Sequence, residues 1–183
     1  MPEPPDRFIS LFHRRWAVPV LVELARGRGA KFVTLANRLE VSRDTLRATL
    51  EDLIDAGWVG RNPGVGHPMR PEYLLTARGE RLAPSSGRLV VVVRRLGIEP
   101  LAFRKWTMPV AYVLADAPHR FSELRGELPQ ITPRALTLAL KDMDRAEIIE
   151  REVIDHYPPV TSYRLQPRAR PLSQVLRPLA KAV

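Results

Sequence analysis

The sequence predicts a mainly helical chain with small antiparallel β-hairpins, built from two tandem copies of one α+β domain. Three observations support this: a repeat with a period of 90 residues, apolar side chains at helical spacing, and turn-rich segments before short strands. A period this long indicates a duplicated domain, since solenoid units are only about 20–50 residues long. We therefore expect one domain at residues 1–90 and a second at residues 91–183. The recurring pairs are Trp16/Trp106, Pro19/Pro109, Leu24/Leu114, Ala25/Ala115, Leu46/Leu136, Leu50/Leu140, Asp52/Asp142, Arg61/Arg151, Pro68/Pro158, Tyr73/Tyr163, Leu75/Leu165, Arg78/Arg168 and Leu82/Leu172.

The first copy opens with helically spaced apolar residues, and Pro19 bends or restarts this helix. After a short extended piece, Thr34 is expected to cap a brief helix. Ser42 is a good N-cap for the next helix, which Gly57 ends. The apolar stripe of that helix is Leu46, Leu50, Leu53 and Ile54. The expected elements are helix 7–26, extended 31–33, helix 34–39, helix 42–56, strand 58–61 and strand 71–75.

The second copy follows the same order with clearer boundaries. Ser122 is expected to cap a short helix, and Thr132-Pro133 gives the next helix an N-cap hydroxyl followed by proline at the first helical position. Leu136, Leu140 and Met143 repeat the apolar stripe. The expected elements are helix 106–115, helix 123–128, a helix that starts at 132, strand 148–153 and strand 160–165.

The order helix, short strand, helix, turn, helix and hairpin is that of a winged helix-turn-helix domain, whose second helix of the pair enters the DNA major groove. The second copy also resembles the HxlR-type winged-helix transcriptional regulators, which are relatives of the MarR group. The resemblance rests on Trp106, Phe121-Ser122-Glu123-Leu124, Leu128, Ile131-Thr132-Pro133-Arg134-Ala135-Leu136-Thr137, Leu140-Lys141 and Tyr157-Pro158-Pro159-Val160-Thr161-Ser162-Tyr163-Arg164-Leu165. The first copy is similar in layout, with Ser42-Arg43-Asp44-Thr45-Leu46 in place of the Thr-Pro-Arg phrase and Pro68-Met69 in place of the double proline.

This resemblance implies a DNA-binding regulator. Members are usually single-copy chains that form homodimers, so two fused copies imply an intramolecular pseudo-dimer that acts as a monomer. Four consecutive valines at residues 90–93 favour a strand by propensity, but the family places its dimer-interface helix here, and we expect helix. Residues 171–182 would be the partner helix. A small-molecule effector would bind at the interface between the copies.

Composition narrows the class of partner. The chain has 29 Lys and Arg against 20 Asp and Glu, a net charge of +9, and both halves share the excess. This charge fits a polyanionic partner, although a solvated surface is the alternative. The chain has no cysteine, which excludes disulfides, thiolate zinc sites and the thiol sensing of some HxlR-type relatives. Neither a membrane span nor a signal peptide is recognisable, and we expect a cytoplasmic protein.

The candidate DNA contacts lie on the second helix of each pair and on the hairpins. Arginine can bind guanine through two hydrogen bonds, threonine can contact the thymine methyl group, and a helix N-terminus suits a phosphate. The two sets differ, so we expect an asymmetric operator. The recognition-helix candidates are Ser42, Arg43, Asp44 and Arg47, with Thr132, Arg134, Thr137 and Lys141. The hairpin, or wing, candidates are Arg61, His67 and Arg70, with Arg151, His156 and Arg164.

An enzyme is not expected. Gly64-Val65-Gly66 lies in a hairpin rather than between a strand and a helix, and the four histidines have no metal-ligand spacing, so neither a metal nor a cofactor is predicted. Two alternatives stay open. One is a tandem winged-helix adaptor for protein–protein contact, as in chromosome segregation or complex assembly. The other is a nonspecific nucleoid-type DNA binder.

Overall fold

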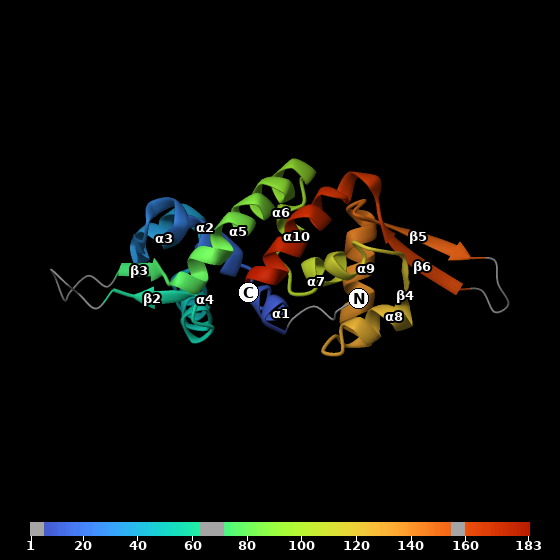
Figure 1. The fold of residues 1–183 in the computed structure, drawn as a ribbon, viewed down its shortest axis with the longest axis horizontal. Helices are drawn as coiled ribbons and strands as arrows, with labels where there is room; N and C mark the ends of the chain where they lie inside the picture. The colour runs from blue at the N-terminus through green and yellow to red at the C-terminus, as the bar shows by residue number, and fades with distance from the viewer. Residues whose placement is uncertain (1–5, 63–71, 155–159) are drawn as a thin grey trace.

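The computed structural model describes residues 6–62, 72–154 and 160–183. The molecule is elongated, with one lobe for each copy and a hairpin at each end of its long axis (Figure 1). Helices dominate and each lobe carries one small antiparallel sheet, which confirms the predicted fold class.

The first copy contains the predicted order of elements, except that the helix expected over residues 7–26 is two helices, Asp6–Leu11 and Ala17–Gly27, and the break lies before Ala17 rather than at Pro19. Its helix-turn-helix pair is formed by the third and fourth helices, and the hairpin follows directly. The elements are α1 (Asp6–Leu11), α2 (Ala17–Gly27), β1 (Ala30–Lys31), α3 (Phe32–Leu39), α4 (Arg43–Asp55), β2 (Val59–Arg61), β3 (Glu72–Leu75) and α5 (Ala77–Leu96).

The second copy repeats this order. A one-turn 3₁₀ helix at Pro167–Ala169 precedes its last helix. The elements are α6 (Glu99–Ala102), α7 (Thr107–Val113), β4 (His119–Arg120), α8 (Phe121–Glu127), α9 (Pro133–Arg145), β5 (Ile149–Ile154), β6 (Val160–Leu165) and α10 (Pro171–Ala182).

The two recognition helices begin as the sequence predicts. The Ser42 hydroxyl accepts a hydrogen bond from the Thr45 amide of α4 at 3.3 Å, and the Thr132 hydroxyl accepts one from the Ala135 amide of α9 at 3.2 Å. Each cap satisfies one of the amides that a helix N-terminus leaves unpaired. The predicted apolar stripes are buried: Leu46, Leu50 and Leu53 in α4, and Leu136, Leu140 and Met143 in α9.

The starts of the two preceding helices were predicted wrongly. Helix α3 begins at Phe32 after Lys31, and α8 begins at Phe121 after Arg120, so neither Thr34 nor Ser122 is an N-cap. In α8 the Glu123 carboxylate instead accepts a hydrogen bond from the Arg120 amide at 2.6 Å. The Glu123 side chain, inside the first turn, therefore accepts the hydrogen bond at the start of this helix, where we expected a hydroxyl group just before the helix to act as the cap.

Each lobe has a three-stranded sheet, in the orders β1-β3-β2 and β4-β6-β5. The register is the same in both copies, because Arg61 faces Tyr73 in the first sheet and Arg151 faces Tyr163 in the second. A short extended piece was predicted before the helix in each copy, but at residues 31–33 and at Phe121; the strands lie one or two residues earlier, because Phe32 and Phe121 already open the helices. The hairpins are therefore held against the helices by a third strand on the far side of β3 and β6.

The same ion pair supports both recognition helices. Arg14 Nε lies 2.7 Å from Asp52 Oδ2, and Arg104 Nη1 lies 2.6 Å from Asp142 Oδ2, at positions 90 residues apart. Each ion pair joins the turn before α2 or α7 to the recognition helix of the same copy. The sequence repeat is thus also a repeat of contacts.

Helix α5 runs through residue 90 without a break, even though Pro84 lies inside it, so the valine run is helical as predicted. Helix α5 packs against α2 and along α10. Helices α5 and α10 cross the middle of the molecule side by side (Figure 1). The first helix also crosses to the other copy: the Phe8 and Tyr112 rings lie 5.0 Å apart, and Gln130 donates a hydrogen bond to Asp6 at 2.8 Å. The join between the copies is therefore a packed apolar interface, with Leu89, Val93, Leu176 and Leu179 fully buried.

Candidate nucleic-acid interface

In the first copy, all four predicted residues of the recognition helix are exposed: Ser42, Arg43, Asp44 and Arg47. They lie at the N-terminal end of α4. They are exposed because the buried apolar stripe occupies the opposite face of the helix. Arg47 Nη1 lies 3.3 Å from Asp44 Oδ1, so an acidic neighbour already engages one of the two arginines. Both side chains of this pair are exposed to solvent.

In the second copy, Thr132, Arg134, Thr137 and Lys141 are also exposed on one helix. The Thr137 hydroxyl donates to the Pro133 carbonyl at 2.9 Å, so its proton is not available to an outside acceptor. Within the described residues, neither Arg134 nor Lys141 forms an ion pair. Their cationic groups are free to meet an external anion.

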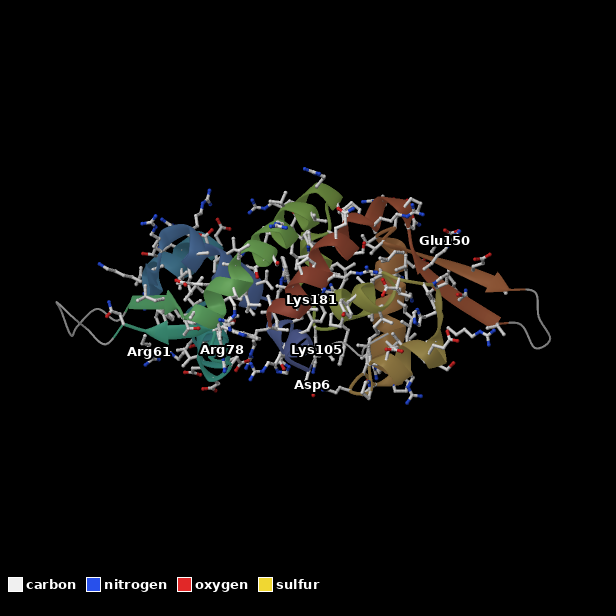
Figure 2. The ribbon with its side chains drawn as sticks, in the orientation of Figure 1. Asp6, Arg61, Arg78, Lys105, Glu150 and Lys181 are labelled. Atoms are coloured by element: carbon white, nitrogen blue, oxygen red, sulfur yellow. The ribbon has the colours of Figure 1, made fainter. Side chains whose placement is uncertain are left out.

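The wing residues fall into different environments. Arg61 is exposed at the outer end of β2, where Figure 2 shows it, and its guanidinium lies 5.7 Å from the centre of the Tyr73 ring. Arg164 Nη2 lies 3.0 Å from Glu150 Oε2 on the paired strand, which compensates its charge inside the hairpin. Arg151 is exposed. The predicted contacts His67, Arg70 and His156 lie outside the described residues.

A groove of about 300 Å³ lies between α9 and the wing of the second copy. It brings together three predicted residues: Thr137 and Lys141 from the helix and Arg151 from β5. The sequence did not indicate that Asp144 and Tyr163 would share this groove. Its full lining is Phe121, Thr137, Leu140, Lys141, Asp144, Arg151 and Tyr163.

The sequence also places Leu138 on the outward surface of α9 with Arg134, Thr137 and Lys141, and it is 53% exposed there. An exposed leucine beside cationic side chains is suited to an apolar group on a polyanionic partner.

A second cavity, of about 270 Å³, lies at the join between the copies, among α2, α3, α5 and α6. Its apolar lining is Trp16, Pro19, Val22, Leu39, Val90, Val93 and Phe103. Its charged lining is Arg15, Glu23, Arg38, Arg94 and Glu99. Glu23 and Arg38 form an ion pair at 3.4 Å.

Two helix-turn-helix units, each followed by a hairpin and each presenting an exposed, capped second helix, define a protein of the winged helix-turn-helix class. The model of the HxlR-like helix-turn-helix family matches this chain twice, over residues 11–95 and 101–183. The chain belongs to this family, as its sequence motifs predicted, and it carries two copies of the domain.

Individual relatives align with part of this chain. An uncharacterized HTH-type transcriptional regulator of Bacillus subtilis, YdeP, is 40% identical over 72 residues, which cover 39% of this chain and 56% of YdeP. The HTH-type transcriptional regulator YodB of the same organism is 31% identical over 74 residues, covering 40% of this chain and 66% of YodB. The chain thus spans little more than half the length of YdeP.

Two solved structures are similar over one copy's length. The reduced form of YodB is 30% identical and covers 44% of this chain and 82% of its own, with a TM-score of 0.41. The redox regulator HypR in its oxidized form is 32% identical and covers 45% of this chain and 84% of its own, with a TM-score of 0.43.

Proposed function

We propose that this protein is a sequence-specific DNA-binding transcriptional regulator that binds one duplex operator through α4 and α9. The observation that carries the proposal is that both helices expose cationic N-terminal halves beside a wing. Backbone amides and the positive end of the helix dipole favour phosphate at that end, and arginines there can bind guanine edges. Relatives named HTH-type transcriptional regulators support the same function.

The two copies would act as an intramolecular pseudo-dimer, and the chain as a monomer. The packing of α5 along α10 and the contact of Phe8 with Tyr112 support this arrangement. Winged-helix pairs bind half-sites about 10 base pairs apart. Arg43, Asp44 and Arg47 stand where Pro133, Arg134 and Thr137 stand in the second copy, so the operator would be asymmetric.

The wings would contact the sugar-phosphate backbone. Arg61 and Arg151 suit this role because both are exposed and neither is held in an ion pair by a described residue. Arg164 suits it less, since Glu150 engages it. Such contacts position the protein on the duplex without specifying sequence.

An effector would occupy the cavity at the join between the copies. Residues of both the helix-turn-helix unit and the interface helix line it, so a bound molecule could alter the angle between them. In the second copy, Tyr112 stands where the first has Val22, and its ring packs on Phe8. One effector per chain is therefore expected.

The decisive experiment selects bound sequences from random duplexes and then measures affinity across a salt series. We expect an enriched asymmetric site and a steep loss of affinity with salt, because phosphate neutralisation releases counterions. No binding to any duplex at low salt would favour the adaptor function. Equal competition by random duplex would favour a nucleoid-type binder, and preference for a perfect inverted repeat of either half would contradict the asymmetric operator.

A further inference from the structure

The recognition helices carry opposite charges at three equivalent, exposed positions. When the copies are aligned by the 90-residue repeat, an acid of α4 corresponds to a base of α9 at each of these positions. The pairs are Asp44 and Arg134, Glu51 and Lys141, and Asp55 and Arg145. Over its whole length α4 has two bases and four acids, whereas α9 has three bases and two acids.

The remaining bases of α4 do not cancel this difference. Arg43 and Arg47 replace Pro133 and Thr137, but Arg47 is paired with Asp44 at 3.3 Å. The bases of α9 differ, since Arg134 and Lys141 have no ion pair among the described residues, and Lys141 shares the groove with Arg151. A phosphate in that groove would meet two cations and one acid, Asp144, whereas its equivalent in the first copy would meet one acid, Glu51, beside one cation, Arg61.

The apolar surface is also different. Leu138 is 53% exposed on α9, and its equivalent in α4 is the half-buried Ala48. The C5-methyl group of thymine is the apolar feature of the major groove, and aliphatic side chains contact it. The second copy therefore presents a larger and more exposed apolar side chain at this position than the first.

We propose that α9 is the dominant DNA-recognition helix, an inference that rests on the proposed function. Its Arg134 and Lys141, together with Arg151 of the adjacent strand β5, supply most of the phosphate affinity, and Leu138 specifies thymine in its half-site. Helix α4 contacts DNA through its first turn at Arg43, because Glu51 and Asp55 repel phosphates farther along the helix. The fused chain thus binds one strong and one weak half-site.

The first part of the test establishes which half-site each copy occupies. The chain has no cysteine, so a single introduced cysteine can carry a DNA-cleaving chelate. Suitable positions are Asn37 of α3 and Gly126 of α8, which correspond when the first residues of the two helices, Phe32 and Phe121, are aligned at an offset of 89 residues. Both positions are exposed. The cleavage pattern on the selected duplex assigns its halves to the two copies.

The second part scrambles each half-site in turn. We expect scrambling of the α9 half to lower affinity at least about tenfold more than scrambling of the α4 half. The Glu51→Lys/Lys141→Glu double variant keeps the net charge and exchanges it between the copies, so it should reduce or reverse this difference. Equal losses for both halves, or a larger loss for the α4 half, would overturn the proposal while leaving the regulator function intact. Absence of binding by the wild type to any duplex would overturn both.

The third part tests Leu138. Replacing the thymines of the α9 half by uracils removes their methyl groups and should weaken wild-type binding about fourfold for each methyl contacted. The Leu138→Ala variant should bind both duplexes equally. A Leu138→Ala variant that loses as much on thymine-to-uracil replacement as the wild type would remove Leu138 from the proposal.

Discussion

Gly79 lies in the first turn of α5, where this helix approaches the backbone of Trp58, just before the strand β2. A Cβ atom at this position would lie 2.0 Å from the Trp58 carbonyl oxygen, which is more than 1 Å inside a normal carbon–oxygen contact. That carbonyl accepts a hydrogen bond from the Thr76 amide at 3.1 Å, so relief of the clash would also disturb this bond. Overpacking costs about 1–3 kcal/mol. A weakened buried hydrogen bond adds about 1 kcal/mol.

We therefore expect Gly79→Ala to lower the free energy of unfolding by about 3 kcal/mol. For a chain of this size, the melting temperature should fall by roughly 6–12 °C. Gly87→Ala on the same helix is the matched control, because its Cβ would meet no described atom within 4 Å. This control should gain up to about 1 kcal/mol. Equal melting temperatures for the two variants, measured by circular dichroism, would refute the reasoning.

Three further predictions concern the recognition helices and the cavity. Thr132→Ala removes the cap of α9 and should cost about 1 kcal/mol in thermal unfolding, an outcome that an unchanged melting temperature would contradict. Arg134→Ala should cost about 1–3 kcal/mol of operator affinity and relax preference at one base position; unchanged affinity and specificity would remove Arg134 from the site. Val22→Tyr should fill the cavity at the join and abolish thermal stabilisation by any effector found in a ligand screen, while operator affinity without effector stays at the wild-type value.

The recognition helices could be predicted from sequence because their signals are local. Ser42 and Thr132 need only their own helix to act as caps, and a leucine spacing of three or four residues defines the buried face in any surroundings. The duplication added a second, independent copy of each signal. Thr132-Pro133 marks one helix start more clearly, and Ser42 marks the equivalent start in the first copy from its own residue type.

The starts of α3 and α8 depend on signals that compete with one another. Serine and threonine are favoured caps, but Ser122 lies inside the helix, because Glu123 reaches back to the Arg120 amide. The phenylalanine that opens each helix is drawn against the core, which fixes the start ahead of the hydroxyl. Burial of the phenylalanines therefore outweighed the local preference for a hydroxyl cap on which the prediction of Thr34 and Ser122 rested.

The pairing of charges also needed the structure. Arg164 looked like a free wing cation until the strand register placed Glu150 directly opposite it. The groove likewise joins Lys141 to Arg151 through the distance between a helix and a strand, which no spacing in the sequence encodes. Such contacts depend on tertiary geometry, and a motif lists only the residue types.

Helix α5 leads from the first helix-turn-helix unit into the second copy, and α6 begins only three residues after it ends. A regulator assembled from two separate chains dissociates on dilution, so its occupancy of DNA falls with the square of its concentration. On the proposed arrangement, one polypeptide brings both halves together permanently, and occupancy falls only linearly. Such a protein could act at very low copy number, and neither half could be exchanged for that of a related protein in the same cell.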